Sequence, residues 1–277
     1  MEEKVLLTDM IDTLTNCEFK DVIIPMGVKE NGEKVYEYFL NMNHIFIAGA
    51  TGTGKSMFAH TLILSLTKQL SFDKLDLILI DPKRTEYYEY AEKKYHYVTD
   101  IKEAGQVFKD LINEMEKRYA MLAESKVKNI EQYNALEQNI SNQLKHIVVI
   151  VDEFCDIEIE DNQSIENVKR LIQRGRASGI NLVIATQRPS FIEEKHSFIK
   201  NFPTQIVFKL ISEADSKYLI GSKDAYELNG KGEAIVNNPN KRYKVQTPIA
   251  FKKTIESIRE NNTDNLPYLT RSLQKGN

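Results

Sequence analysis

The residues best able to do chemistry form a glycine-rich loop. Gly49-Ala50-Thr51-Gly52-Thr53-Gly54-Lys55-Ser56 follows the pattern G-x-x-x-x-G-K-S, and Met57 comes directly after it. Glycines let successive backbone N–H groups point at phosphate oxygens, and a helix starting near Lys55 adds the positive end of its dipole. Lys55 would place its charge on the β- and γ-phosphates, and Ser56 would offer a hydroxyl to Mg²⁺. The pattern predicts a P-loop, which binds a nucleotide.

A P-loop needs a second acidic residue to hold its metal ion. Asp152-Glu153 follows the apolar run 147–151, which is the Walker B pattern. Asp152 would hold Mg²⁺ through water, and Glu153 would orient and deprotonate the attacking water. The competing interpretation is that two solvated acids cap a strand.

Two more polar side chains follow apolar runs. Gln187 would sense the γ-phosphate or the attacking water, or else serve as an amide that closes a loop. Asp81, which precedes Pro82-Lys83, would assist the metal or cap the following helix. The sequence leaves both choices open.

These residues need a frame of strands and helices. Short apolar runs alternate with longer amphipathic stretches, which is typical of βαβ units and a mainly parallel sheet. We expect strands at 45–47, 75–80, 147–151, 182–184 and 206–208. We expect helices at 55–68, 101–124 and 164–177, with Gly179 closing the last one. Two β-hairpins are expected, one within 20–38 around Asn31-Gly32 and one within 232–247.

Taken together, the motifs resemble the FtsK/SpoIIIE DNA-translocase motors, a branch of the RecA-like P-loop ATPases. Besides the P-loop and Walker B stretches, the resemblance rests on residues 80–83, 113–119, 129–134, 175–182 and 185–190. It covers roughly residues 20 to 255. We therefore expect an α/β fold with a small N-terminal helix and β lead-in at 1–40, a RecA-like motor domain at 41–255 and a flexible tail at 256–277.

The resemblance implies an ATPase that drives double-stranded DNA through a homo-oligomeric ring, usually a hexamer. ATP and Mg²⁺ would be its cofactors, and chromosome segregation or a conjugation-like DNA transfer, as in minimal motors of mobile elements, would be its process. Arg176 matches the arginine that completes the neighbouring subunit's ATP site, where a planar cation stabilises developing charge. Arg174 is the substitute candidate, and a surface arginine at a helix end is the plain alternative for Arg176.

The resemblance also implies that three basic residues contact DNA: Arg188, Lys195 and Lys223. Such contacts hold the phosphate backbone without reading base sequence. The chain departs from the family pattern here, because Glu193 and Glu194 precede Lys195. Two other functions therefore stay open. One is a related secretion ATPase that engages a protein, and the other is a nucleotide-gated recruitment module without motor activity.

Composition limits the remaining classes. The 277 residues are 42% hydrophobic and carry a net charge of −3, which excludes a disordered chain and a polycation that coats DNA. Cys17 and Cys155 are too far apart for a metal-binding pair. No apolar run approaches the length of about 18 residues that spans a bilayer. We expect a cytoplasmic protein, with a membrane or secretion-channel partner left open.

Overall fold

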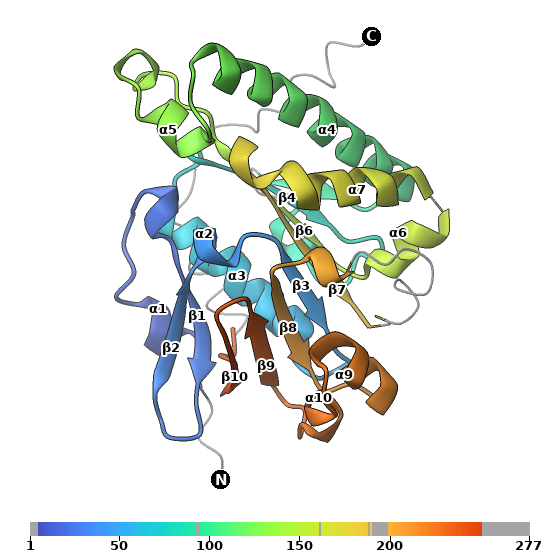
Figure 1. Ribbon diagram of the computed structural model, residues 1–277. Helices are drawn as coiled ribbons and strands as arrows, with labels where there is room; N and C mark the ends of the chain where they lie inside the picture. The colour runs from blue at the N-terminus through green and yellow to red at the C-terminus, as the bar shows by residue number, and fades with distance from the viewer. Residues whose placement is uncertain (1–4, 92–94, 161, 188, 190–198, 251–277) are drawn as a thin grey trace. The chain divides into compact units, whose positions relative to one another are not determined.

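The computed structural model describes residues 5–91, 95–160, 162–187, 189 and 199–250. These residues divide into two compact units. The first contains the residues up to Ser71 and those from Ile184 onward, and the second contains Phe72–Val183. Figure 1 shows both units and labels most of their strands and α-helices.

The first unit has the strand order β2-β1-β10-β9-β8-β3. β3 and β8 are paired in parallel, and the other neighbours are antiparallel. Both predicted hairpins are confirmed as β1–β2 and β9–β10. The strands are β1 (Ile23–Val28), β2 (Lys34–Tyr38), β3 (Ile45–Ala48), β8 (Thr204–Phe208), β9 (Glu233–Asn238) and β10 (Lys241–Gln246).

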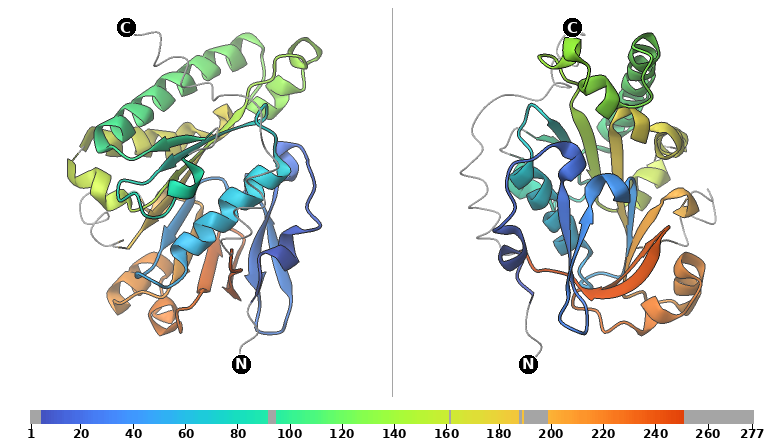
Figure 2. Two further views of the ribbon diagram at one scale, coloured as in Figure 1. Left: turned by 180° about the vertical axis from the view of Figure 1, so that it is seen from behind. Right: turned by 60° about the vertical axis from the view of Figure 1, so that its left-hand side comes forward.

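The main helix of the first unit is α3 (Lys55–Gln69), which confirms the predicted helix. It packs against β1 (Figure 2). Its residues are buried along almost its whole length, as in a helix that is enclosed by the core. The remaining helices are short. They are α1 (Thr8–Ile11), η1 (Phe19–Asp21), α2 (Phe39–Met42), η5 (Ile199–Asn201), α9 (Glu213–Ile220) and α10 (Asp224–Glu227).

The second unit has the strand order β7-β6-β4-β5, and β4 pairs in parallel with both β5 and β6. β4 and β6 are buried along their full length, as expected of parallel strands that are covered on both faces. The strands are β4 (Leu75–Ile80), β5 (His96–Val98), β6 (His146–Val151) and β7 (Ile180–Thr186), whose last residues belong to the first unit.

Two long helices, α4 (Ile101–Glu124) and α7 (Asn162–Arg174), pack side by side in the second unit (Figures 1 and 2). α4 has the predicted bounds, and its Asp100 cap accepts a hydrogen bond from the Glu103 N–H. The shorter helices are α6 (Phe154–Glu160), α5 (Ile130–Asn134), η2 (Tyr88–Tyr90), η3 (Glu137–Asn139) and η4 (Arg176–Ser178).

The helix predicted at 164–177 is wrong at its carboxyl end. α7 ends at Arg174, and a separate 3₁₀ turn, η4, follows. The Ser178 hydroxyl bonds back to the Gly175 carbonyl at 2.8 Å, which favours the tighter turn over another α-helical turn. Gly179, which was predicted to close the longer helix, closes η4 instead and has a left-handed backbone.

The α/β fold with a mainly parallel central sheet, flanking helices and a β lead-in is confirmed. The hairpins add antiparallel strands to the first unit only. The domain boundaries at 40 and 255 stay predictions, and residues 256–277 lie outside the described residues.

Candidate functional site

The P-loop joins the end of β3 to the start of α3 in the first unit. Gly54 precedes the helix with φ of 126°, a value that side chains disfavour, and a Cβ there would lie 3.0 Å from the Gly232 Cα. Gly54 has no side chain that could cap α3. A helix that starts without a side-chain cap presents the positive end of its dipole, which favours a bound anion.

Lys55 turns its ammonium group toward this loop. Its side chain is buried, and Nζ donates to the Ala50 carbonyl at 3.5 Å. The Thr53 hydroxyl donates to the same carbonyl at 2.7 Å, and Ser56 and Met57 are half-buried at the start of α3. All the predicted residues of Gly49–Met57 lie in one loop–helix junction, and their individual roles stay predictions.

Gln187 lies beside the P-loop. The Thr51 hydroxyl donates to Gln187 Oε1 at 2.7 Å, and the Gly49 N–H donates to the Thr186 carbonyl at 3.3 Å. The end of β7 and the P-loop, which lie more than 130 residues apart in the sequence, thus meet within the first unit. This position suits either a sensor of the γ-phosphate or an amide that closes the loop, so the choice made from the sequence stays open.

A cavity of about 1150 Å³ begins at the P-loop. Gly52, Gly54 and Met57 form its P-loop side. Much of the remaining wall is apolar and comes from Val5, Val28, Val245, Pro248 and Ile249. The wall also includes five charged residues, which are Lys29, Glu30, Lys231, Glu233 and Lys244. A cavity that begins at the P-loop and has both apolar and charged walls is a candidate ligand site. Sequence reasoning missed it because the lining residues form no motif.

The acidic pair lies in the second unit, at the carboxyl end of β6. Ile80 of β4 and Val151 of β6 are register partners, so Asp81 and Asp152 follow neighbouring positions at the same sheet edge. Asp152 and Glu153 are both buried. Glu153 has φ of 49°, a left-handed backbone that is uncommon outside glycine and concentrated at functional sites.

Asp81 holds the loop that follows β4. Its Oδ2 accepts hydrogen bonds from the Glu86 and Tyr87 N–H groups, each at 3.0 Å, and from the Tyr97 hydroxyl at 3.3 Å. Burial and the Asp81 charge raise the pKa of Tyr97 to about 12. Asp81 Oδ1 is buried and makes no hydrogen bond within the described residues. Asp81 therefore holds the loop before η2, but it does not cap that helix, whose cap position is Tyr87. One Asp81 oxygen is left for a metal or a water.

Lys83 is a site residue to which the sequence assigned no role. Its ammonium pairs with Asp156 at 3.2 Å. Burial opposes its charge, but Asp156, Glu153 and Asp152 together raise the pKa of Lys83. Lys83 thus stands in the field of the Walker B acids. Its position directly after Asp81-Pro82, at a strand end, was the feature of the sequence that could have indicated a functional role.

The structure separates the two arginine candidates. The Arg174 guanidinium binds both oxygens of Glu116, at 2.7 and 3.3 Å, and stacks on the Tyr119 ring with its centre 4.9 Å from the ring centroid. Arg176 is exposed, and among the described residues its guanidinium makes no hydrogen bond or ion pair. Arg176 is thus the one of the two that can reach a neighbouring molecule.

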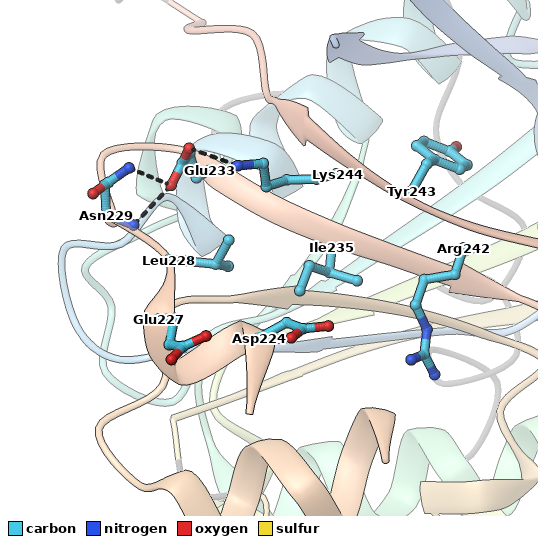
Figure 3. A pocket seen from close by; sticks show the side chains of 9 residues that line it. All are labelled: Asp224, Glu227, Leu228, Asn229, Glu233, Ile235, Arg242, Tyr243 and Lys244. Carbon is cyan, nitrogen blue, oxygen red and sulfur yellow. Dashed lines mark hydrogen bonds and ion pairs between the residues drawn. The ribbon is translucent and has the colours of Figure 1, made fainter. Parts of the chain in front are cut away.

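Of the three predicted DNA contacts, Arg188 and Lys195 lie outside the described residues. Lys223 lies at the start of α10 and pairs with Glu227 at 2.7 Å; that contact is the main reason the pKa of Lys223 is raised. A nearby pocket of about 340 Å³ carries charges of both signs (Figure 3). It is lined by Asp224, Glu227, Leu228, Asn229, Glu233, Ile235, Arg242, Tyr243 and Lys244. The predicted DNA contacts stay predictions.

The structure brings the predicted residues together in two groups. The P-loop and Gln187 share the first unit, and Asp152, Glu153 and Arg176 belong to the second. Among the described residues, no three His, Cys, Asp or Glu side chains form a metal cluster. Taken one by one, the Ser56 hydroxyl and the Asp152 carboxylate are hard oxygen ligands of the kind that Mg²⁺ prefers.

Comparison with known proteins assigns the family. The FtsK/SpoIIIE family pattern matches residues 7–191, so the chain belongs to the FtsK/SpoIIIE family. The chain is 37% identical over 244 residues to the DNA translocase FtsK of Borreliella burgdorferi, covering 84% of this chain and 30% of that protein. The DNA translocase FtsK of Bacillus anthracis is 36% identical over 244 residues, covering 83% and 31%. The chain thus spans about a third of these relatives.

Solved structures assign the fold. The pCW3 conjugation coupling protein TcpA, in monomer form with ATPgS, superposes with a TM-score of 0.74 at 24% identity over 89% of this chain and 73% of that one. The cytoplasmic domain of the Thermomonospora curvata type VII secretion ATPase EccC gives a TM-score of 0.81 at 18% identity over 96% and 35%. The resemblance drawn from the motifs is confirmed, and the chain is a member of a P-loop ATPase family.

No helix in the described part of the chain is long and apolar enough to cross a membrane.

Proposed function

We propose that this chain is an ATP-driven motor that translocates double-stranded DNA as a homo-oligomer, as the resemblance to FtsK motors implies. The observation that carries the proposal is the family membership of a chain whose P-loop is intact and lies against Gln187. The relatives that are 37% and 36% identical to it over 244 residues are named DNA translocases. Chromosome segregation and transfer by a mobile element are both compatible with that activity.

Each residue has a part in the proposed ATP chemistry. The P-loop amides and Lys55 bind the phosphates, and Ser56 and Asp152 hold Mg²⁺, which neutralises charge on the phosphate oxygens. Glu153 orients and deprotonates the attacking water, and Gln187 reports on the γ-phosphate. Arg176 of a neighbouring subunit stabilises the charge on the transferred phosphoryl group, which makes hydrolysis depend on assembly.

A second candidate is a motor that engages a protein. Two observations favour it: the net charge is −3, and Lys223 is already paired with Glu227. The secretion ATPases EccC and EssC share the fold. DNA remains the better proposal, because the sequence relatives of higher identity are the DNA translocases.

The deciding experiment is a steady-state ATPase assay with and without duplex DNA at several salt concentrations. A DNA motor should be stimulated several-fold at about 50 mM salt, and the stimulation should fade by about 300 mM because backbone contacts release counterions. The matched variant is Glu153→Gln. It should bind ATP normally and lose at least ~100-fold in turnover, because it removes the proposed general base.

Two results would contradict the proposal. If DNA fails to stimulate at any salt concentration while turnover is normal, a protein client becomes the better assignment. If Glu153→Gln hydrolyses ATP at the rate of the unchanged chain, Glu153 is not the base.

A further inference from the structure

Arg176 lies on a short turn whose two flanks are held by one helix. We propose that Arg118 and Tyr119 of α4 are positioning residues for Arg176, so that α4 sets the geometry of the arginine offered to the neighbouring ATP site. The inference rests on the proposed function, in which Arg176 acts in trans. It assigns a role to the stretch 113–119, to which the sequence assigned none.

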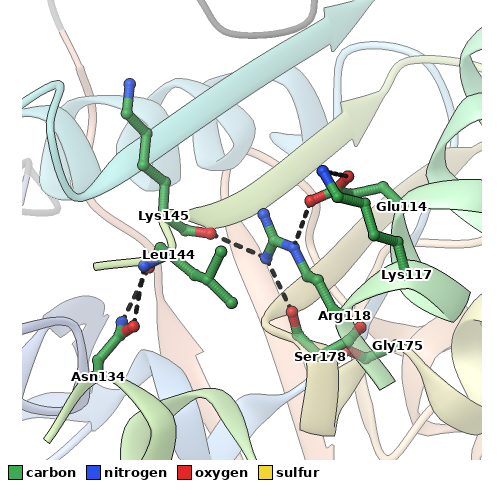
Figure 4. Close-up of polar contacts among 8 residues, drawn as sticks. All are labelled: Glu114, Lys117, Arg118, Asn134, Leu144, Lys145, Gly175 and Ser178. Carbon is green, nitrogen blue, oxygen red and sulfur yellow. Dashed lines mark hydrogen bonds and ion pairs between the residues drawn. The ribbon is translucent and has the colours of Figure 1, made fainter. Parts of the chain in front are cut away.

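Arg118 holds the carboxyl side of the turn. It is 3% exposed, and its Nη1 donates to the Ser178 carbonyl at 2.8 Å and to the Lys145 carbonyl at 2.9 Å (Figure 4). Its Nε donates to Glu114 Oε1 at 2.8 Å, so the buried charge is paired within α4. A planar guanidinium with three fixed contacts defines the position of the Ser178 carbonyl more tightly than one flexible donor would.

Tyr119 holds the amino side of the turn. Its hydroxyl donates to the Arg174 carbonyl at 2.7 Å, and its ring lies under the Arg174 guanidinium, which Glu116 also binds. Arg174 is therefore part of the support. Arg176 lies between the two held carbonyls, at residues 174 and 178, and is left exposed.

The short helix α5 completes the support. Ile130 of α5 is buried so close to Gly179 that a Cβ on the glycine would lie 2.5 Å from Ile130 Cδ1. Asn134 of α5 exchanges two hydrogen bonds with the Leu144 backbone, at 2.8 and 2.9 Å (Figure 4). Burial raises the pKa of Glu131, and the Arg176 charge opposes that change, so Arg176 lies within electrostatic reach of α5. The turn thus rests on α4 and α5, and both lie far from it in the sequence.

The test introduces each positioning substitution into a Glu153→Gln subunit, which cannot hydrolyse ATP itself. Any change in turnover then reports only on the Arg176 that this subunit offers to its neighbour. Arg176→Ala chains keep their own P-loop and acids but lack the arginine, and Glu153→Gln chains keep the arginine but not the base. Mixing the two should restore turnover at sites that combine an Arg176→Ala chain with a Glu153→Gln neighbour. Replacing the second chain with Glu153→Gln/Tyr119→Phe should lower the restored kcat about fivefold, with the KM for ATP unchanged. That factor corresponds to one lost hydrogen bond of ~1 kcal/mol.

Two controls separate positioning from folding. Tyr36→Phe removes a hydroxyl that bonds to the Met10 carbonyl in the first unit, and in the same assay it should leave the restored kcat unchanged. Arg118→Lys, which retains the positive charge but not the planar guanidinium with its several donors, should also lower the restored kcat. Urea unfolding of each variant establishes that the chain is folded.

The outcomes are distinct. If Arg176→Ala alone is fully active, or if mixing restores nothing, Arg176 does not act in trans and the inference falls with that part of the proposed function. If mixing restores turnover but Tyr119→Phe and Arg118→Lys have no effect on it, the inference alone is overturned.

Discussion

Arg118 is a charged residue in the middle of an apolar helix face. It follows the buried positions Leu111 and Met115 and precedes Leu122, at helical spacings of four and three residues. A cation on such a stripe must be paired, because an isolated buried charge is costly. The sequence therefore indicates that Arg118 is buried and paired. It does not indicate the partners, which come from segments 27 and 60 residues away.

His146 gives a pH prediction. It is buried at the start of β6, and burial together with the Arg118 charge lowers the pKa of His146 to about 3 from its usual 6.5. Between pH 6.5 and about 3, His146 is protonated in the unfolded chain but not in the folded chain. The free energy of unfolding therefore falls as the pH is lowered through this range. The His146 contribution at pH 5.5 should be ~1 kcal/mol lower than at pH 7.5.

Urea unfolding at pH 7.5 and 5.5 measures this change. His146→Gln, which does not titrate, should show a smaller loss of stability between the two pH values than the unchanged chain. Equal losses in both chains would mean that His146 is not the titrating group.

At the scale of elements, two glycines end helical segments with the same left-handed backbone but different surroundings. Gly179 closes η4 at φ of 77°, and Gly221 closes α9 at φ of 72°. A Cβ on Gly179 would lie 2.5 Å from Ile130 Cδ1, whereas a Cβ on Gly221 would meet nothing within 4 Å. Substituting each glycine with alanine therefore distinguishes the cost of backbone strain, which both positions share, from the cost of steric crowding, which only Gly179 has.

Gly221→Ala should cost about 1 kcal/mol of unfolding free energy, the backbone effect alone. Gly179→Ala should cost about 2–4 kcal/mol, because α5 or η4 must also move. Urea midpoints at constant slope measure both changes. Equal costs would show that Ile130 yields without penalty, and the proposed support of η4 by α5 would be weaker than argued.

At the scale of the whole molecule, the proposed role of the exposed Arg176 would make turnover a property of the assembly. Arg174 is bound within its own chain, so it does not replace Arg176 without breaking its contacts with Glu116 and Tyr119. The proposed motor therefore needs a neighbour for each active site, and its activity is linked to protein concentration by mass action.

ATPase activity per subunit should rise at least ~10-fold as the chain is concentrated through its assembly range, because an arginine finger contributes far more than that to turnover. Arg176→Ala should be low at every concentration, and sizing in the presence of an ATP analogue should show the same assembly range. Activity per subunit that is constant on dilution to a monomer would contradict a site completed in trans.

Much of the fold was predictable because its signals are local. The run 147–151, the spacing of apolar residues over 101–124 and the turn at Asn31-Gly32 specify a strand, a helix and a hairpin within a few residues each. The end of α7 was not predictable in the same way. It depends on Ser178 and Gly179, which are themselves held by Arg118 and Ile130 from other elements.

The sequence by itself determined the family, the P-loop, the acidic pair and most of the strands and helices, because each is set by residue types at short spacing. Only the tertiary structure decided that Asp81 holds the loop after β4, that Arg174 is bound by Glu116 and that Arg176 is left exposed. The physical reason is that a charged side chain has the same local pattern whether it is paired or free. Its partner is chosen by the packing of segments far apart in the chain.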